Sequence, residues 1–118
     1  MSVMTRIAEK IPSFPHSLET PSGKRFKITH TDSGKVLIET GRTPSIIKIP
    51  ASVLEEAPNF LRGKGWISIG PVQGNSDELS LDSLARSRAP YVAPLLELAE
   101  IAEIDRSRPA KVRLKASY

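Results

Sequence analysis

Between residues 79 and 115 the spacing of apolar residues changes from a helical period to an alternating one. Apolar residues first recur at three- and four-residue steps, which place side chains on one face of a helix. They do so in residues 81–85, behind a serine, Ser80, that can cap a helix, and again in residues 92–99. In residues 111–115 apolar and basic residues alternate, as they do in a half-buried strand. The stretch therefore predicts two short helices followed by a β-hairpin.

Residues 24–49 have the pattern of a three-stranded antiparallel β-meander. Apolar and polar residues alternate in residues 24–30, and a Thr-Asp-Ser-Gly turn then leads into a second strand over residues 36–40. Residues 45–49 form the third expected strand, which Pro50 closes. Three strands are enough to support a sheet with one apolar face.

The segments on either side of the meander are divided by prolines. Residues 1–23 contain three prolines and are expected to form an extended arm. Residues 50–61 predict a helix, but Pro58 has no amide hydrogen for the carbonyl of Leu54, so we expect a kink there or two short helices. Residues 66–69 read as a short strand. In the helix expected after the bend, the first fully helical residue should come no earlier than about Val92, with Pro94 in the first turn.

The order of these elements resembles a known superfamily. Helix, short strand, helix, tight turn, helix and hairpin follow one another in residues 50–115, which is similar to the winged helix-turn-helix domain. The resemblance implies an α+β fold in three parts: an extended arm (residues 1–23), a β-meander (residues 24–49) and a winged helix-turn-helix domain (residues 50–118). In such a domain the bend and the start of the second helix face the major groove of DNA, and the wing tip reaches the flanking backbone.

Basic residues gather at the two places that this arrangement would bring onto one surface, the bend between the helices and the hairpin. Guanidinium groups suit phosphate oxygens, and a tyrosine ring can pack on a sugar with its hydroxyl on a phosphate. The residues that we expect to bind nucleic acid are Arg86, Arg88, Tyr91, Arg106, Arg108, Lys111 and Arg113. The competing interpretation is an ordinary solvated surface, because a quarter of the chain is charged.

The start of the second helix offers little for reading a DNA sequence. Its outward positions would include Tyr91, Ala93, Pro94 and Glu97, which present few donors to base edges. We therefore expect contacts mainly to phosphates, and the net charge of +4 favours such a polyanionic partner.

The inventory of reactive groups argues against an enzyme. There is no cysteine, which excludes disulfides, thiolate nucleophiles and cysteine-bound metals. Two histidines, His16 and His30, are too few for a metal site and poorly placed for a Ser-His-acid site. Asp32 and Glu39 with Lys48 could form a nuclease-like group, but two solvated carboxylates are the favoured interpretation. We expect no catalytic residue, no metal and no cofactor.

These observations predict a non-enzymatic protein that binds double-stranded DNA, either as a transcriptional regulator or as an architectural protein. No apolar run is long enough to cross a bilayer, so we expect a cytoplasmic protein without a membrane partner. The meander is a candidate surface for a homodimer. The alternative is a protein-interaction module of a larger complex, which would use the apolar face of the second helix or an acidic stripe formed by Glu97, Glu100 and Glu103.

Overall fold

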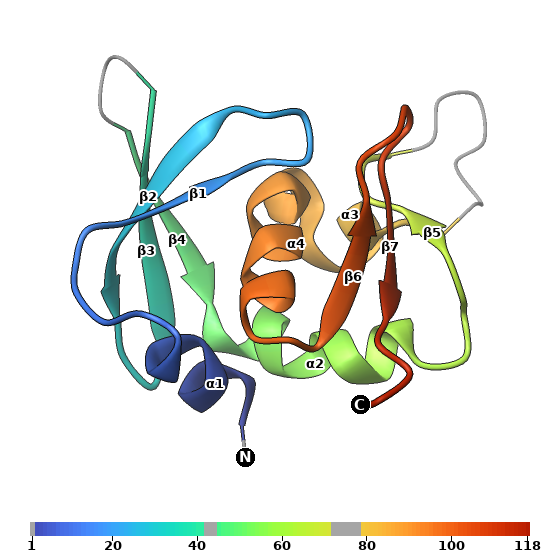
Figure 1. Ribbon diagram of the computed structural model, residues 1–118, viewed down its shortest axis with the longest axis horizontal. Coiled ribbons are helices and arrows are strands. Elements are labelled where there is room, and N and C mark those ends of the chain that lie inside the picture. The colour runs from blue at the N-terminus through green and yellow to red at the C-terminus, as the bar shows by residue number, and fades with distance from the viewer. Residues whose placement is uncertain (1, 42–44, 72–78) are drawn as a thin grey trace.

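Two antiparallel sheets lie on either side of helix α4 (Ala89–Leu98) in the computed structural model, which describes residues 2–41, 45–71 and 79–118 (Figure 1). The larger sheet has the order β1 (His16–Glu19), β2 (Arg25–Thr31), β3 (Lys35–Thr40), β4 (Ser45–Pro50). The smaller sheet has the order β5 (Ile67–Ser68), β7 (Lys111–Leu114), β6 (Ala102–Asp105). The other helices are α1 (Val3–Glu9), α2 (Ala51–Leu61), α3 (Leu81–Ala85) and the 3-10 turn η1 (Arg86–Arg88). The chain is thus a mixed α+β protein.

The larger sheet has four strands within the described residues, whereas the sequence predicts three. The additional strand is β1, which pairs with β2 in antiparallel register and sets His16 opposite Ile28. It lies in the segment that we expected to be an extended arm. Its four residues contain one large apolar side chain, Leu18, so no alternation was visible in the sequence. These residues form a strand because they pair with β2, and not because of a pattern in their own sequence.

Helix α1 also comes from the expected arm, and its N-terminus is held by two side chains. The Ser2 hydroxyl accepts a hydrogen bond from the Thr5 amide at 3.1 Å. The Glu55 carboxylate of α2 accepts hydrogen bonds from the amides of Val3 and Met4 at 2.9 and 3.1 Å. A carboxylate at this position satisfies amide hydrogens that have no partner inside the helix and opposes the positive end of the helix dipole. Glu55 therefore joins α1 to α2.

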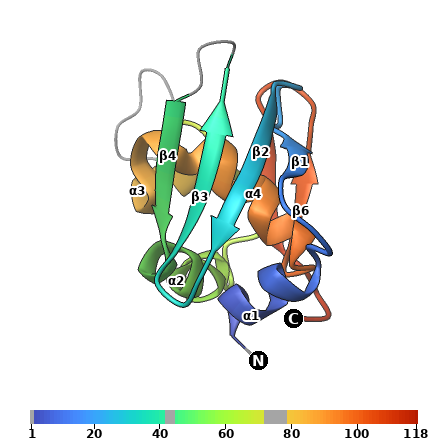
Figure 2. The ribbon, with the colours of Figure 1, turned by 90° about the vertical axis from the view of Figure 1, so that its left-hand side faces the viewer.

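One hydrophobic core runs through the whole fold. Ile7 of α1, Ile28 of β2, Leu54 of α2, Leu95 of α4 and Val112 of β7 are all fully buried and belong to the same cluster. In β2 and β3 alternate residues are buried, so each strand turns one face inward. Figure 2 shows this sheet from its outer side, with the helices behind it. The core therefore makes no division between the meander and the residues that follow it.

The prolines in the helices differ from expectation. Helix α4 begins at Ala89, three residues earlier than predicted, because η1 leads directly into it and Pro90 occupies its first turn, where no amide donor is needed. Pro94 consequently lies in the helix interior and not in the first turn. Pro58 lies inside α2, which is assigned as one continuous helix rather than as two short ones.

We predict that Glu55→Ala lowers the free energy of unfolding by about 1 kcal/mol, because two amides at the start of α1 lose their acceptor. Urea denaturation of the variant and the wild type measures the change. The neighbouring exposed residue provides a matched control, since Glu56→Ala should change stability by less than about 0.5 kcal/mol. Equal losses in the two variants would contradict the role given to Glu55.

Candidate nucleic-acid interface

The bend between α3 and α4 carries two exposed arginines. Arg86 ends α3 with φ of 52°, in the left-handed region that non-glycine residues seldom adopt, and so turns the chain sharply into η1. The Nε of Arg88 donates a hydrogen bond of 2.8 Å to the backbone carbonyl of Lys48 in β4. Because β4 is an edge strand of the larger sheet, this contact fixes the bend beside that edge.

Two arginines of the expected hairpin surface are paired with glutamates. Arg106 forms two parallel hydrogen bonds with Glu97, at 2.7 and 2.8 Å, and these bonds raise the pKa of Arg106. The Nε of Arg113 lies 2.8 Å from Glu103, and its guanidinium carbon lies 4.5 Å from the centre of the Trp66 ring. Both arginines thus stabilise the hairpin, and their charges are largely balanced.

Lys111 has an acidic neighbour as well. It lies directly opposite Asp105 in the register of β6 and β7. Hydrogen bonds from the amide and hydroxyl of Ser107 lower the pKa of Asp105, and the charge of Lys111 lowers it further. The smaller sheet therefore presents alternating positive and negative side chains, and not the uniformly cationic ribbon that the sequence suggested.

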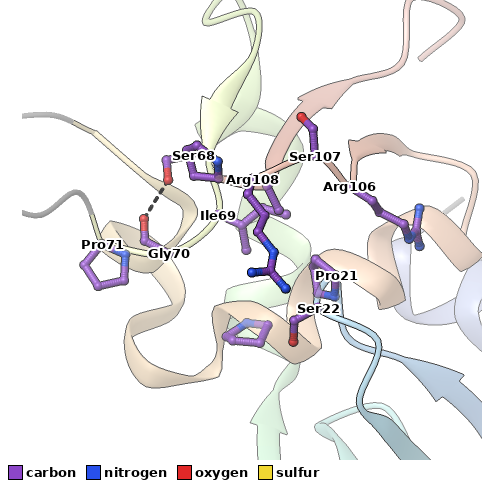
Figure 3. Close-up of a pocket in the computed structure, with 12 residues that line it drawn as sticks. Pro21, Ser22, Ser68, Ile69, Gly70, Pro71, Arg106, Ser107 and Arg108 are labelled. Carbon is purple, nitrogen blue, oxygen red and sulfur yellow. Dashed lines mark hydrogen bonds between the residues drawn. The ribbon is translucent and has the colours of Figure 1, made fainter.

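Arg108 at the tip of the hairpin differs from these residues. It is exposed and has no hydrogen bond or ion pair with any residue that the structure describes. Its side chain runs from the hairpin towards the turn between β1 and β2, where Pro21 and Ser22 lie (Figure 3). A cavity of about 450 Å³ separates these segments, and Pro90 at the start of α4 lines it too. The hairpin tip thus lies beside Pro90, which is at the start of α4 and follows Arg88 by two residues in the sequence.

The expected role of helix α4 in a DNA groove is not compatible with its surroundings. Six of its ten residues are buried, including Ala93 and Pro94, which we expected to face outward. The Tyr91 ring packs edge-on against Phe26 of β2, with ring centres 5.3 Å apart. The larger sheet therefore lies against this side of α4 (Figure 1), and Tyr91 is half-buried where it contacts Phe26. A helix enclosed on both sides cannot lie in the major groove of a duplex, which must admit the helix surface itself.

The expected acidic stripe does not form either, because its members lie on different elements. Glu97 is in α4 and binds Arg106, whereas Glu103 is in β6 and binds Arg113. Glu100 follows α4 with φ of 61° and lies 2.9 Å from the Nζ of Lys10. The hydrogen bond from Lys10 lowers the pKa of Glu100.

Asp32 and Glu39 of the larger sheet do not form a catalytic pair, and Asp32 instead stabilises the turn between β2 and β3. Asp32 accepts hydrogen bonds from the amide of Gly34 and from the side chains of Lys35 and His30, all within 2.9 Å. These bonds strongly lower the pKa of Asp32. Glu39 lies near the far end of β3, so the two carboxylates do not converge. In the parts of the chain that are described, no three acidic or histidine side chains are grouped as metal ligands would be.

The chain was compared with protein-family models, curated proteins and solved structures, and none of them matches it. Among the described helices none has the length and apolar character that crossing a bilayer requires.

We predict that Arg106 and Glu97 are energetically coupled, since their bidentate contact joins the hairpin to α4. A double-mutant cycle of Arg106→Ala and Glu97→Ala should give a coupling of about 0.5–1 kcal/mol, the upper range for an exposed pair. The equivalent cycle on Arg25 and Glu19, whose atoms are 3.8 Å apart, should give a value near zero. Equal couplings in the two cycles would show that the Arg106 contact has no special role.

We also predict that Asp32→Asn destabilises the protein at neutral pH and has less effect in acid. The pKa of Asp32 is lowered by folding, so its contribution is fully present above the unfolded-state value near 4 and is lost as the pH falls through the folded-state value. Thermal unfolding of both proteins should therefore differ at pH 7 and converge progressively below about pH 4. A difference that does not shrink in acid would contradict this assignment.

Proposed function

We propose that this chain is a non-enzymatic protein that binds double-stranded DNA, mainly through its phosphates. The observation that carries the proposal is the position of three arginines, Arg86, Arg88 and Arg108, at the end of the molecule where α4 begins. Within the described residues none of the three forms an ion pair with a carboxylate. Exposed guanidinium groups whose charge is not neutralised by a carboxylate can bind phosphate oxygens.

The arrangement of the elements favours contact through the hairpin tip and the bend. The larger sheet covers α4, and η1 and residues 106–109 are among the described segments that are exposed at this end. Both would lie along the DNA backbone, and Lys111 would add a weaker contact because Asp105 is beside it. Arg106 and Arg113 would act by holding the hairpin in shape, and Tyr91 by packing against the sheet.

A winged helix-turn-helix domain in residues 50–115 is part of this proposal. The order α2, β5, α3, α4, β6, β7 and the sheet order β5-β7-β6 support it. In this protein the wing, and not the second helix, would be the element that meets DNA. Because phosphate contacts carry no sequence information, an architectural role in the cytoplasm fits better than recognition of a specific operator.

A second candidate function is supported by strand β4. It is an edge strand of the larger sheet, and its Ile46 side chain is 61% exposed. An exposed edge with an apolar side chain can pair with a strand of another protein or of a second copy of this chain. Affinity capture with and without nuclease would separate this function from DNA binding, since a protein partner is retained after nuclease treatment and a nucleic-acid bridge is not.

The DNA proposal predicts a definite dependence on salt. Three phosphate contacts give a slope of about −2.7 for log affinity against log salt, which is a loss of about 40-fold between 50 and 200 mM. Arg108→Gln and Arg86→Gln should each reduce the magnitude of the slope by about 0.9. Fluorescence anisotropy with a short labelled duplex measures both quantities.

Arg62→Gln is the matched control, since Arg62 is an exposed arginine at the end of α2. It should leave both the affinity and the slope unchanged. A salt-independent affinity, or the same loss in the control, would overturn the proposal.

A further inference from the structure

The cavity beside Arg108 has the volume of a small-molecule site. Its volume of about 450 Å³ lies within the range of about 300–1,000 Å³ that ligand pockets occupy. Four segments distant in sequence form it: the turn between β1 and β2, the residues after β5, the start of α4 and the hairpin tip (Figure 3). A site assembled from separate elements is defined by the tertiary fold and not by one loop.

Prolines recur in the walls of the cavity. Each of the four segments contributes a proline, namely Pro21, Pro71, Pro90 and Pro109. Proline rings have a fixed φ and little side-chain entropy to lose when a ligand binds. Such walls suit a flat, weakly polar body that can lie against them.

Among the described residues that line the cavity, Arg108 is the one charged side chain without an ion-pair partner. Arg106 is occupied by Glu97, and the Ser68 hydroxyl donates to the Gly70 carbonyl at 2.9 Å. Arg108 extends along the cavity without a partner among the described residues, and its planar fork matches a phosphate group. Ser22, also in the wall, has a hydroxyl that is within 3.1 Å of Thr20 and can make a further hydrogen bond.

We propose that this cavity binds a nucleoside monophosphate unit, with the base against the proline walls and the phosphate on Arg108. The proposal goes beyond DNA binding through the exposed arginines. It requires that the cavity holds a nucleotide base, in addition to the contact of Arg108 with a phosphate. The unit is either a free nucleotide or one nucleotide of a single strand, and the chemistry of recognition is the same in both.

The test is calorimetric titration of the full chain with dAMP, deoxyadenosine, inorganic phosphate and benzoate. We expect dAMP to bind about ten-fold or more tightly than each of the other three, since deoxyadenosine lacks the phosphate, inorganic phosphate lacks the base and benzoate lacks both. Equal affinity for inorganic phosphate would reduce the site to an ion site and overturn the proposal. Equal affinity for deoxyadenosine or benzoate, or no binding of dAMP at millimolar concentration, would overturn it too.

Two variants connect the binding to the cavity. Arg108→Gln should weaken dAMP about ten-fold, because a charged hydrogen-bond donor is lost, and Arg62→Gln should not. Ser22→Trp should fill the cavity and abolish dAMP binding while leaving the affinity for duplex DNA unchanged. Circular dichroism and thermal unfolding establish that each variant is folded. Unchanged dAMP binding in Ser22→Trp would show that the nucleotide binds elsewhere.

A single-stranded tetranucleotide distinguishes the two sources. Tighter binding than dAMP, lost in Ser22→Trp, identifies a nucleotide within a strand, and no gain over dAMP identifies a free nucleotide. Failure of the DNA proposal leaves this test intact, because dAMP titration does not use a duplex.

Discussion

The burial of helix α4 between two sheets is the constraint on which the rest of the structure depends. Val92, Leu95 and Leu96 are fully removed from solvent, and each buried aliphatic side chain contributes about 1.5–3 kcal/mol. The helix is therefore the common core of both sheets. Tyr91 of α4 packs edge-on against Phe26 of β2, so this side of the helix faces the larger sheet and not solvent.

Enclosing α4 also determines how the charges are used. Glu97 lies near the end of the helix, where its carboxylate reaches Arg106 in the segment after β6. Glu103 and Arg113 then pair across the smaller sheet. Two arginines that the sequence suggested as phosphate contacts, Arg106 and Arg113, therefore form ion pairs on the surface of the hairpin. Arg86 and Arg88 at the bend and Arg108 at the hairpin tip, by contrast, have no carboxylate partner among the described residues.

Local elements could be predicted from the sequence, because they depend on periodicity. The hairpin of β2 and β3, the helix α2, the two helices around the bend and the final hairpin lie close to their expected residues. Strand β1 could not be predicted, since its four residues have no visible alternation without their partner. The position of the sheet over α4 was also hidden, because Ala93 and Pro94 are equally consistent with an exposed or a buried face. The pairing of Arg106 and Arg113 depends on that same packing.

The proline-lined cavity follows from the way in which the two sheets meet. The turn between β1 and β2 belongs to the larger sheet and the hairpin tip to the smaller one, and both extend past the start of α4 (Figure 1). Side chains from the two turns line the cavity together with Pro90 of α4, and prolines lie on each side of it. Arg108 is the residue that spans this gap. The packing of the two sheets around α4 therefore leaves a cavity at the start of this helix, and Arg108 places a positive charge in it.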